Sequence, residues 1–197
     1  MDPLDQLLSN YLAQFFKENG AGRELAHGLE QIGIGTGPLI DHCTIRTHDV
    51  DSRARQFLEL GYTHDKNIGV LEFDHWWAKV YRKPGHPALF IDQAFDGARG
   101  EQSLISDWVD HHGDQCFHHI AILVENINDI IKILNGKGFR MAGPIIGGAD
   151  SDLRQVFTAP ELKDGQVYSV LELIERHNGY DGFLPPQADG LMESTRR

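Results

Sequence analysis

Apolar residues first recur at helical spacing near the start of the chain. Over residues 3–18, one face of a helix with 3.6 residues per turn would carry Leu4, Leu7, Leu8, Tyr11, Leu12, Phe15 and Phe16. Asn19-Gly20 is typical of a helix end, and a second short helix is expected over residues 23–32. The pattern predicts a helical extension, residues 1–36, that packs against the core or against a partner subunit.

The pattern then repeats itself. Residues 39–62 and 116–139 align without a gap at an offset of 77 residues. Each segment has an apolar strand, a polar turn, an amphipathic helix and a glycine-aromatic end, Gly61-Tyr62 in the first and Gly138-Phe139 in the second. Such an internal repeat predicts two copies of one supersecondary unit.

Each copy continues with three strand-like segments. They cover residues 68–73, 76–82 and 88–93 in the first copy and 140–146, 153–158 and 167–174 in the second. The fold class predicted is α+β: two paired βαβββ modules, residues 37–95 and 116–176, forming an open cup-shaped barrel. A connector with a helix is expected at 96–115 and a C-terminal tail or lid at 177–197, all in one structural domain.

Composition narrows the possible partners. The chain has 197 residues, of which 41% are hydrophobic and 24% charged, as in ordinary globular proteins. A formal net charge of −11 disfavours nucleic acid and anionic membranes as partners, because both attract basic surfaces. Neither a membrane span nor a signal peptide is apparent, and Cys43 and Cys116 lack paired-ligand spacing. The sequence therefore favours a cytoplasmic protein with free thiols.

Three residues at related positions suggest a metal site. His42 and His119 match each other in the repeat, and strand alternation predicts that both point into the cup. Glu172 interrupts the apolar run SVLELI, where a carboxylate is costly unless it is paired or bound to a cation. Two histidines and one carboxylate leave three octahedral positions open. We expect one divalent metal, first Fe(II), with Zn, Ni, Mn or Co as alternatives.

Further polar residues are expected beside this site. Arg46 shares the strand face of His42 and Thr44, where it would bind a substrate carboxylate or else form a surface salt bridge. Gln155 shares a face with Phe157 and either enters the cup or is exposed.

His118 is the alternative to His119 as a ligand. The repeat matches His118 to Asp41 and to the opposite strand face, which favours His119. Positions on the surface, or behind the residues of the site, are expected for the histidines near turns and in the connector, His64, His75, His86, His111, His112 and His177.

Two sets of motifs resemble known families. Residues 152–183 (DLRQVFTAPELKDGQVYSVLELIERHNGYDGF) resemble the metal-binding strand region of the 4-hydroxyphenylpyruvate dioxygenases. The segments DHCTIRT, LELGY, WAKVYRKPG and PALFIDQ of the first module resemble the 2-oxoadipate dioxygenase/decarboxylase family, the hydroxyglutarate synthases. Both belong to the vicinal oxygen chelate (glyoxalase/bleomycin resistance/dioxygenase) superfamily, which the chain resembles over residues 38–176. The chain has only one pair of modules, and residues 1–35 match neither family.

The resemblance implies roles for these residues. His42, His119 and Glu172 would bind iron, Arg46 and Gln155 would be catalytic residues that hold the substrate, and Phe183 would be a lid or stacking residue. Thr44 and Phe157 are expected to line the substrate pocket. The implied activity is that of an Fe(II)-dependent dioxygenase that decarboxylates a 2-oxo acid with incorporation of oxygen from O2. A small-molecule carboxylate substrate is implied, and assembly as a homodimer is left open.

Two other functions fit the same superfamily. A metal-dependent isomerase, epimerase or lyase would use a fourth ligand from the last strand of the first module. There Ile91 is expected to match Glu172, with Asp92 pointing the other way, so the ligand is missing unless Gln93 or a shifted register supplies it. A non-catalytic small-ligand-binding module would more often have lost the metal residues.

Overall fold

A computed structural model describes residues 2–196, and it begins with two helices. In α1 (Pro3–Glu18), the Asp2 side chain accepts a hydrogen bond from the Leu4 amide, and Leu4, Leu8, Tyr11 and Phe15 are buried. Asn19 ends this helix and caps α2 (Gly20–Gln31) by accepting a hydrogen bond from the Gly22 amide. The predicted first helix is confirmed, and the second begins three residues earlier than expected because Asn19 serves both ends.

The repeat forms the two halves of the structure. The first half contains β1 (Ile40–Arg46), α3 (Val50–Glu59), β2 (Thr63–His64), β3 (Val70–Glu72), β4 (Trp76–Arg82) and β5 (Ala88–Ala94). The second contains β6 (His119–Leu123), α5 (Ile127–Gly136), β7 (Leu153–Phe157), β8 (Glu161–Lys163) and β9 (Gln166–Arg176). Between them lies α4 (Leu104–His112), and α6 (Pro185–Ser194) follows β9.

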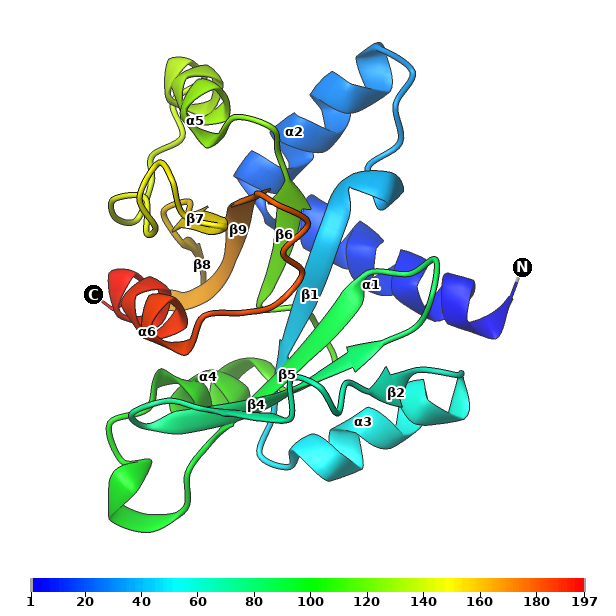
Figure 1. The fold of residues 1–197 in the computed structure, drawn as a ribbon, viewed down its shortest axis with the longest axis vertical. Coiled ribbons are helices and arrows are strands. Elements are labelled where there is room, and N and C mark those ends of the chain that lie inside the picture. The colour runs from blue at the N-terminus through cyan, green and yellow to red at the C-terminus, as the bar shows by residue number, and fades with distance from the viewer. Residues whose placement is uncertain (1, 197) are drawn as a thin grey trace.

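All strands belong to one mixed, nine-stranded sheet. Its order is β2-β4-β5-β1-β6-β9-β7, with β3 paired to β4 and β8 to β9. At the centre, β1 and β6 pair antiparallel, with His42 opposite Ala121 and Thr44 opposite His119. Parallel neighbours β5 and β9 flank this pair. Over residues 2–196 the sheet does not close on itself (Figure 1), which confirms the open, paired architecture.

Strand alternation divides the sheet between two faces. Cys43 and Ile45 belong to the main core, which includes buried residues of α1, α3 and α5. Phe90 belongs to a second cluster on the other face, with Trp108 of α4 and Met192 of α6. Figure 1 shows α6, in red, lying beside β9, and α4 near β5. Residues on this second face are therefore enclosed between the sheet and two helices.

The expected strand over residues 140–146 is wrong. Met141 and Ile146 make only isolated bridges, to Thr158 and Gln155 respectively. Gly143-Pro144 lies between them, and proline has no amide hydrogen to donate to a strand ladder.

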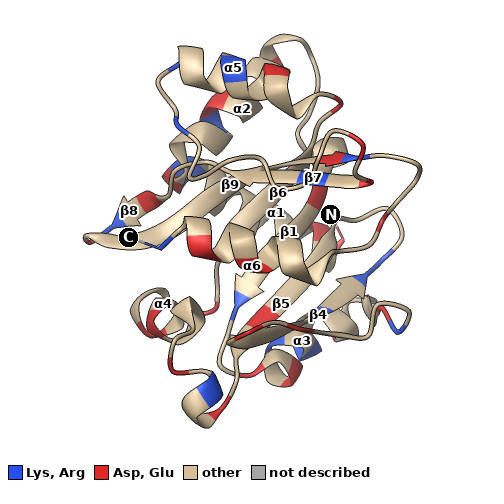
Figure 2. Ribbon diagram, turned by 60° about the vertical axis from the view of Figure 1, so that its left-hand side comes forward, with Lys and Arg blue, Asp and Glu red and all other residues tan. Residues whose placement is uncertain are grey.

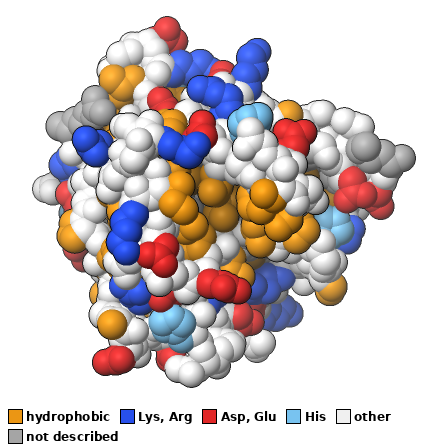
Figure 3. Space-filling model, turned by 90° about the horizontal axis from the view of Figure 1, so that it is seen from above, with side chains coloured by type: hydrophobic (Ala, Val, Ile, Leu, Met, Phe, Trp, Pro, Cys, Tyr) orange, Lys and Arg blue, Asp and Glu red, His pale blue; other side chains and the backbone are white. Residues whose placement is uncertain are grey.

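Charged residues are not confined to one part of the molecule. Charged residues of both signs are spread over helices and loops, without one dominant basic face in the view of Figure 2. Apolar side chains gather around a shallow hollow on the face shown in Figure 3. No helix within residues 2–196 is long and apolar enough to cross a lipid bilayer.

Candidate metal centre

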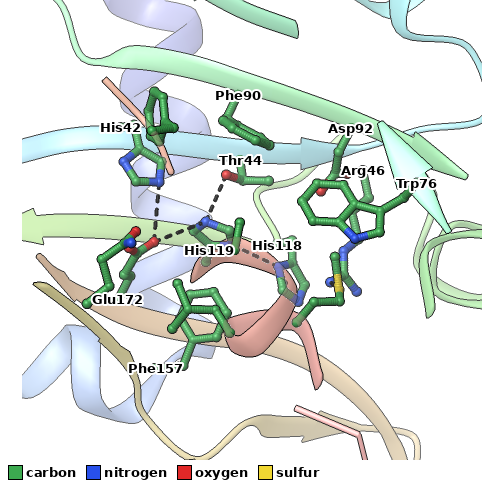
Figure 4. A pocket seen from close by; sticks show the side chains of 15 residues that line it. His42, Thr44, Arg46, Trp76, Phe90, Asp92, His118, His119, Phe157 and Glu172 are labelled. Atoms are coloured by element: carbon green, nitrogen blue, oxygen red, sulfur yellow. Dashed lines mark hydrogen bonds and ion pairs between the residues drawn. The ribbon is translucent and has the colours of Figure 1, made fainter. Parts of the chain in front are cut away.

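His42, His119 and Glu172 meet on the enclosed face of the sheet. They come from β1, β6 and β9, and Glu172 Oε2 lies 3.3 Å from Nε2 of each histidine (Figure 4). Ligands bound at about 2.1 Å on one face of an octahedron are roughly 3.0 Å apart. The observed spacing therefore suits a single metal ion after a small adjustment.

The charge state of the cluster also suits a cation. Burial lowers the pKa of His42, but the carboxylates of Glu172 and Asp41 outweigh burial and raise it to about 9. Burial and the neighbouring His42 hold the pKa of His119 well below its usual value. Glu172 is 1% exposed, and its Oε1 has no hydrogen-bond partner. A divalent ion could replace the proton on His42 and pair with this orphaned oxygen.

Asp41 supports His42 from behind. Its Oδ1 lies 2.8 Å from His42 Nδ1, which leaves Nε2 directed at Glu172. Arg176, at the end of β9, holds both oxygens of Asp41. A carboxylate on the far nitrogen fixes the orientation of a metal-binding histidine. Sequence reasoning missed this role, although an acidic residue directly before a candidate ligand was a usable signal.

Besides Glu172, two residues lie within hydrogen-bond distance of the His119 ring nitrogens. Thr44 Oγ1 lies 2.8 Å from its Nε2, and His118 Nδ1 lies 2.9 Å from its Nδ1. The expectation that His118 points to the opposite face is wrong, because it lines the same cavity. His118 precedes β6, which begins at His119, so strand alternation does not apply to it.

A cavity extends from the three candidate ligands. Every predicted pocket residue lines it: Thr44, Arg46, Gln155, Phe157 and Phe183. Its volume is about 40 Å³, enough for a few water molecules. An organic ligand of several carbon atoms would need more space than this volume offers.

The C-terminal segment lines one side of this cavity. Gln187 Oε1 accepts a hydrogen bond of 2.8 Å from Gln155 Nε2, and Met192 Sδ lies 2.9 Å from Arg46 Nη2. The Phe183 ring packs edge-on against His42 with a centroid distance of 5.1 Å. The two predicted substrate-binding side chains therefore contact α6.

Two expectations for β5 are wrong. Ala88 pairs with His42 as Val170 pairs with His119, so the residue equivalent to Glu172 is Phe90 rather than Ile91. Asp92 does not point away: it lines the cavity and is 1% exposed. The position equivalent to Glu172 still carries no metal-binding group.

Comparisons with known proteins were made by sequence and by structure. No family model matches the sequence, and no curated protein matches it either. Hydroxyglutarate synthase from Oryza sativa, solved in complex with 2-oxoadipate, superposes with a TM-score of 0.74 and 19% identity over 96% of this chain and 91% of that one. A protein assigned as a hydrolase from Shewanella frigidimarina superposes with a TM-score of 0.75 and 18% identity, over 94% of this chain and 99% of that one.

A more distant structural likeness is to methylmalonyl-CoA epimerase from Mycobacterium tuberculosis. Its TM-score is 0.51 with 19% identity, over 72% of this chain and 89% of that one. The first two matches cover most of the chain, including much of the helical extension that the sequence motifs left unmatched. At these identities the likeness concerns the fold, which is that of the vicinal oxygen chelate superfamily.

Proposed function

We propose that this chain, which has the vicinal oxygen chelate fold, is an Fe(II)-dependent dioxygenase that decarboxylates a 2-oxo acid with incorporation of oxygen. The observation that carries the proposal is the cluster of His42, His119 and Glu172, with Phe90 at the position where a fourth ligand would stand. Such a set of three leaves one side of a metal ion free for substrate and O2.

The protein's own residues would bind and orient the substrate. Iron, when bound, would supply coordination sites for the 2-oxo acid and O2 and the redox chemistry between them. Arg46 would hold the far end of the substrate, because it lines the cavity at the end away from Glu172. Gln155 would contact the substrate from the other side of Glu172, because it pairs with Ile174 of β9 whereas Thr44 and His119 align with Val170. Phe157 and Phe183 would keep bulk water from the reacting atoms.

The structural similarities are compatible with two metal-dependent activities. Hydroxyglutarate synthase was solved with a 2-oxo acid bound, which favours the dioxygenase. The epimerase shares the fold too, so a metal-dependent isomerase or lyase is the second candidate. We favour the dioxygenase, because Phe90 occupies the position at which an isomerase or lyase would have its fourth metal ligand. The homodimer and the cytoplasmic location stay predictions.

Metal content and oxygen uptake test the proposal. Protein purified without oxygen is analysed for metals, loaded with Fe(II) and supplied with a panel of 2-oxo acids. We expect O2 consumption that needs both Fe(II) and a 2-oxo acid and that Glu172→Gln abolishes. Silence across the panel with iron-loaded protein would overturn the proposal. Tightly held Zn or Ni without oxygen reactivity would favour the isomerase.

The variant Glu172→Ala separates catalysis from simple binding. A dioxygenase in which the 2-oxo acid binds through the metal loses both metal and substrate affinity. Retained ligand binding without metal would favour the non-catalytic binding module.

A further inference from the structure

Three buried polar atoms without hydrogen-bond partners lie along one part of the cavity. They are Arg46 Nε, Asp92 Oδ1 and His118 Nε2, on side chains whose residues are at most 2% exposed. All three residues line the same cavity as Glu172, and Figure 4 shows Arg46 and Asp92 at the end away from that carboxylate. Buried polar groups nearly always have partners, so three unpartnered atoms together indicate a place for a ligand.

Arg46 and Asp92 have side chains of opposite charge that form no direct contact among the described residues. They are paired in register on the parallel strands β1 and β5. Among the described residues, Arg46 forms no direct ion pair with Asp92 and instead contacts Met192 Sδ and the Trp108 ring. A ligand atom placed between them could accept a hydrogen bond from Arg46 and donate one to Asp92.

His118 would add a second donor when a metal is bound. A metal on His119 Nε2 leaves the hydrogen of that ring on Nδ1, which would donate to His118 Nδ1, 2.9 Å away. The hydrogen of a neutral His118 is then on Nε2, which has no hydrogen-bond partner and belongs to a residue that lines the cavity. This end of the cavity would therefore offer donors from Arg46 and His118 and an acceptor from Asp92.

We infer that this subsite selects a 2-oxo acid whose far end carries an uncharged group that both donates and accepts hydrogen bonds, such as a hydroxyl or a primary amide. Asp92 is the residue that determines this selection. The inference rests on the proposed function. A second carboxylate would pair with Arg46 but would meet the negative charge of Asp92 in a buried space, where like charges repel strongly. A methyl group would leave all three polar atoms without partners.

A matched series of six-carbon 2-oxo acids tests the inference. The far ends are hydroxyl (6-hydroxy-2-oxohexanoate), amide, methyl (2-oxohexanoate) and carboxylate (2-oxoadipate). Calorimetry with Fe(II)-loaded protein, without oxygen at pH 8, measures each Kd. We expect the hydroxyl or the amide to bind at least tenfold tighter than the methyl and carboxylate compounds. In the Asp92→Asn variant, the Kd of 2-oxoadipate should fall at least tenfold relative to the wild type.

The control variant is Asp51→Asn, which removes one negative charge at an exposed carboxylate paired with Lys79. Its Kd values should equal those of the wild type. Tightest binding of 2-oxoadipate by the wild type would overturn the inference and leave the dioxygenase intact. Failure of all four compounds to bind would overturn both. The wild-type ranking decides the matter even where Asp92→Asn does not fold.

Discussion

Arg176 holds both carboxylate oxygens of Asp41, with Nε 2.7 Å from Oδ2 and Nη2 2.9 Å from Oδ1. Asp41 in turn contacts His42 Nδ1. Because Arg176 is in the same strand as Glu172, one strand carries a candidate ligand and also fixes the orientation of another. The guanidinium also donates to the Gly182 carbonyl at 2.8 Å, so the loop before α6 depends on the same residue.

Loss of the Asp41 charge should weaken metal binding. We expect Asp41→Asn to lower the affinity for the metal about 10- to 100-fold, because the supporting carboxylate orients His42 and raises its basicity. The measurement is a metal titration, with thermal unfolding of the metal-free protein as a check on the fold. Asp150→Asn, at an exposed turn residue, is the matched control. Equal affinities in the two variants would contradict the supporting role.

Binding of 2-oxoadipate should weaken as the pH rises. Burial raises the pKa of Asp92 to about 7, although Arg46 acts to lower it. Protonated Asp92 tolerates a neighbouring carboxylate, so the Kd should be level below pH 7 and rise roughly tenfold per pH unit above it.

The other groups around Asp92 set the conditions for this measurement. Arg46 of β1 and His118 line the cavity with it, while α4 contributes the uncharged Trp108 nearby and α6 contributes Ala188, Leu191 and Met192. Calorimetry on metal-saturated protein is the readout. Asp92→Asn should give a flat profile, and tighter binding at high pH in the wild type would count against the assignment.

Glu175 should make the fold sensitive to acid. Burial raises its pKa, but the Ile127 amide and Arg154 outweigh burial and lower it. Its stabilising contribution is therefore complete above the unfolded pKa of about 4.3 and is lost as the pH falls through the lower, folded value. Glu175→Gln should lower the free energy of unfolding by about 1–3 kcal/mol at pH 7, and by less at pH 3.5.

Urea unfolding at the two pH values measures this difference. The exposed Glu125 provides the control variant, Glu125→Gln. A deficit of Glu175→Gln that stays constant with pH would show that the carboxylate charge contributes nothing.

Removal of the Gln187 side chain should favour substrate binding. Gln187 occupies the amide of Gln155, which a substrate would otherwise contact. A hydrogen bond worth about 1 kcal/mol corresponds to roughly fivefold tighter binding of a 2-oxo acid in Gln187→Ala. The exposed Gln31→Ala is the control, and Kd values by calorimetry are the measure. Weaker binding would mean that Gln187 contacts the substrate itself.

The sequence repeat predicted the positions of His42 and His119 because it can be recognised within two short segments of the chain. His42 and His119 lie at the same position of two similar segments, so aligning the segments also aligned the two candidate ligands. Their meeting follows from the antiparallel pairing of β1 and β6. The boundaries of the first helix were equally local, since its apolar stripe and its polar caps lie within one short stretch.

Asp92 and α6 could not be placed in the same way. The face of Asp92 depends on its register against Arg46, which hydrogen bonds between distant strands determine. The α6 segment, PPQADGLMES, has few apolar residues, so its position depends on contacts with Arg46, Trp76 and Gln155 in the folded protein. Contacts of this kind between distant residues cannot be predicted from the local sequence pattern.

The central pairing of β1 with β6 has a consequence for how the site arises. His42 belongs to one half of the chain, and His119 and Glu172 belong to the other. Neither half by itself holds three ligands, so a cut in the connector before α4 would leave two fragments without a complete centre. A metal ion would bind tightly only where the fragments reassociate, and it would then hold the two halves of the chain together.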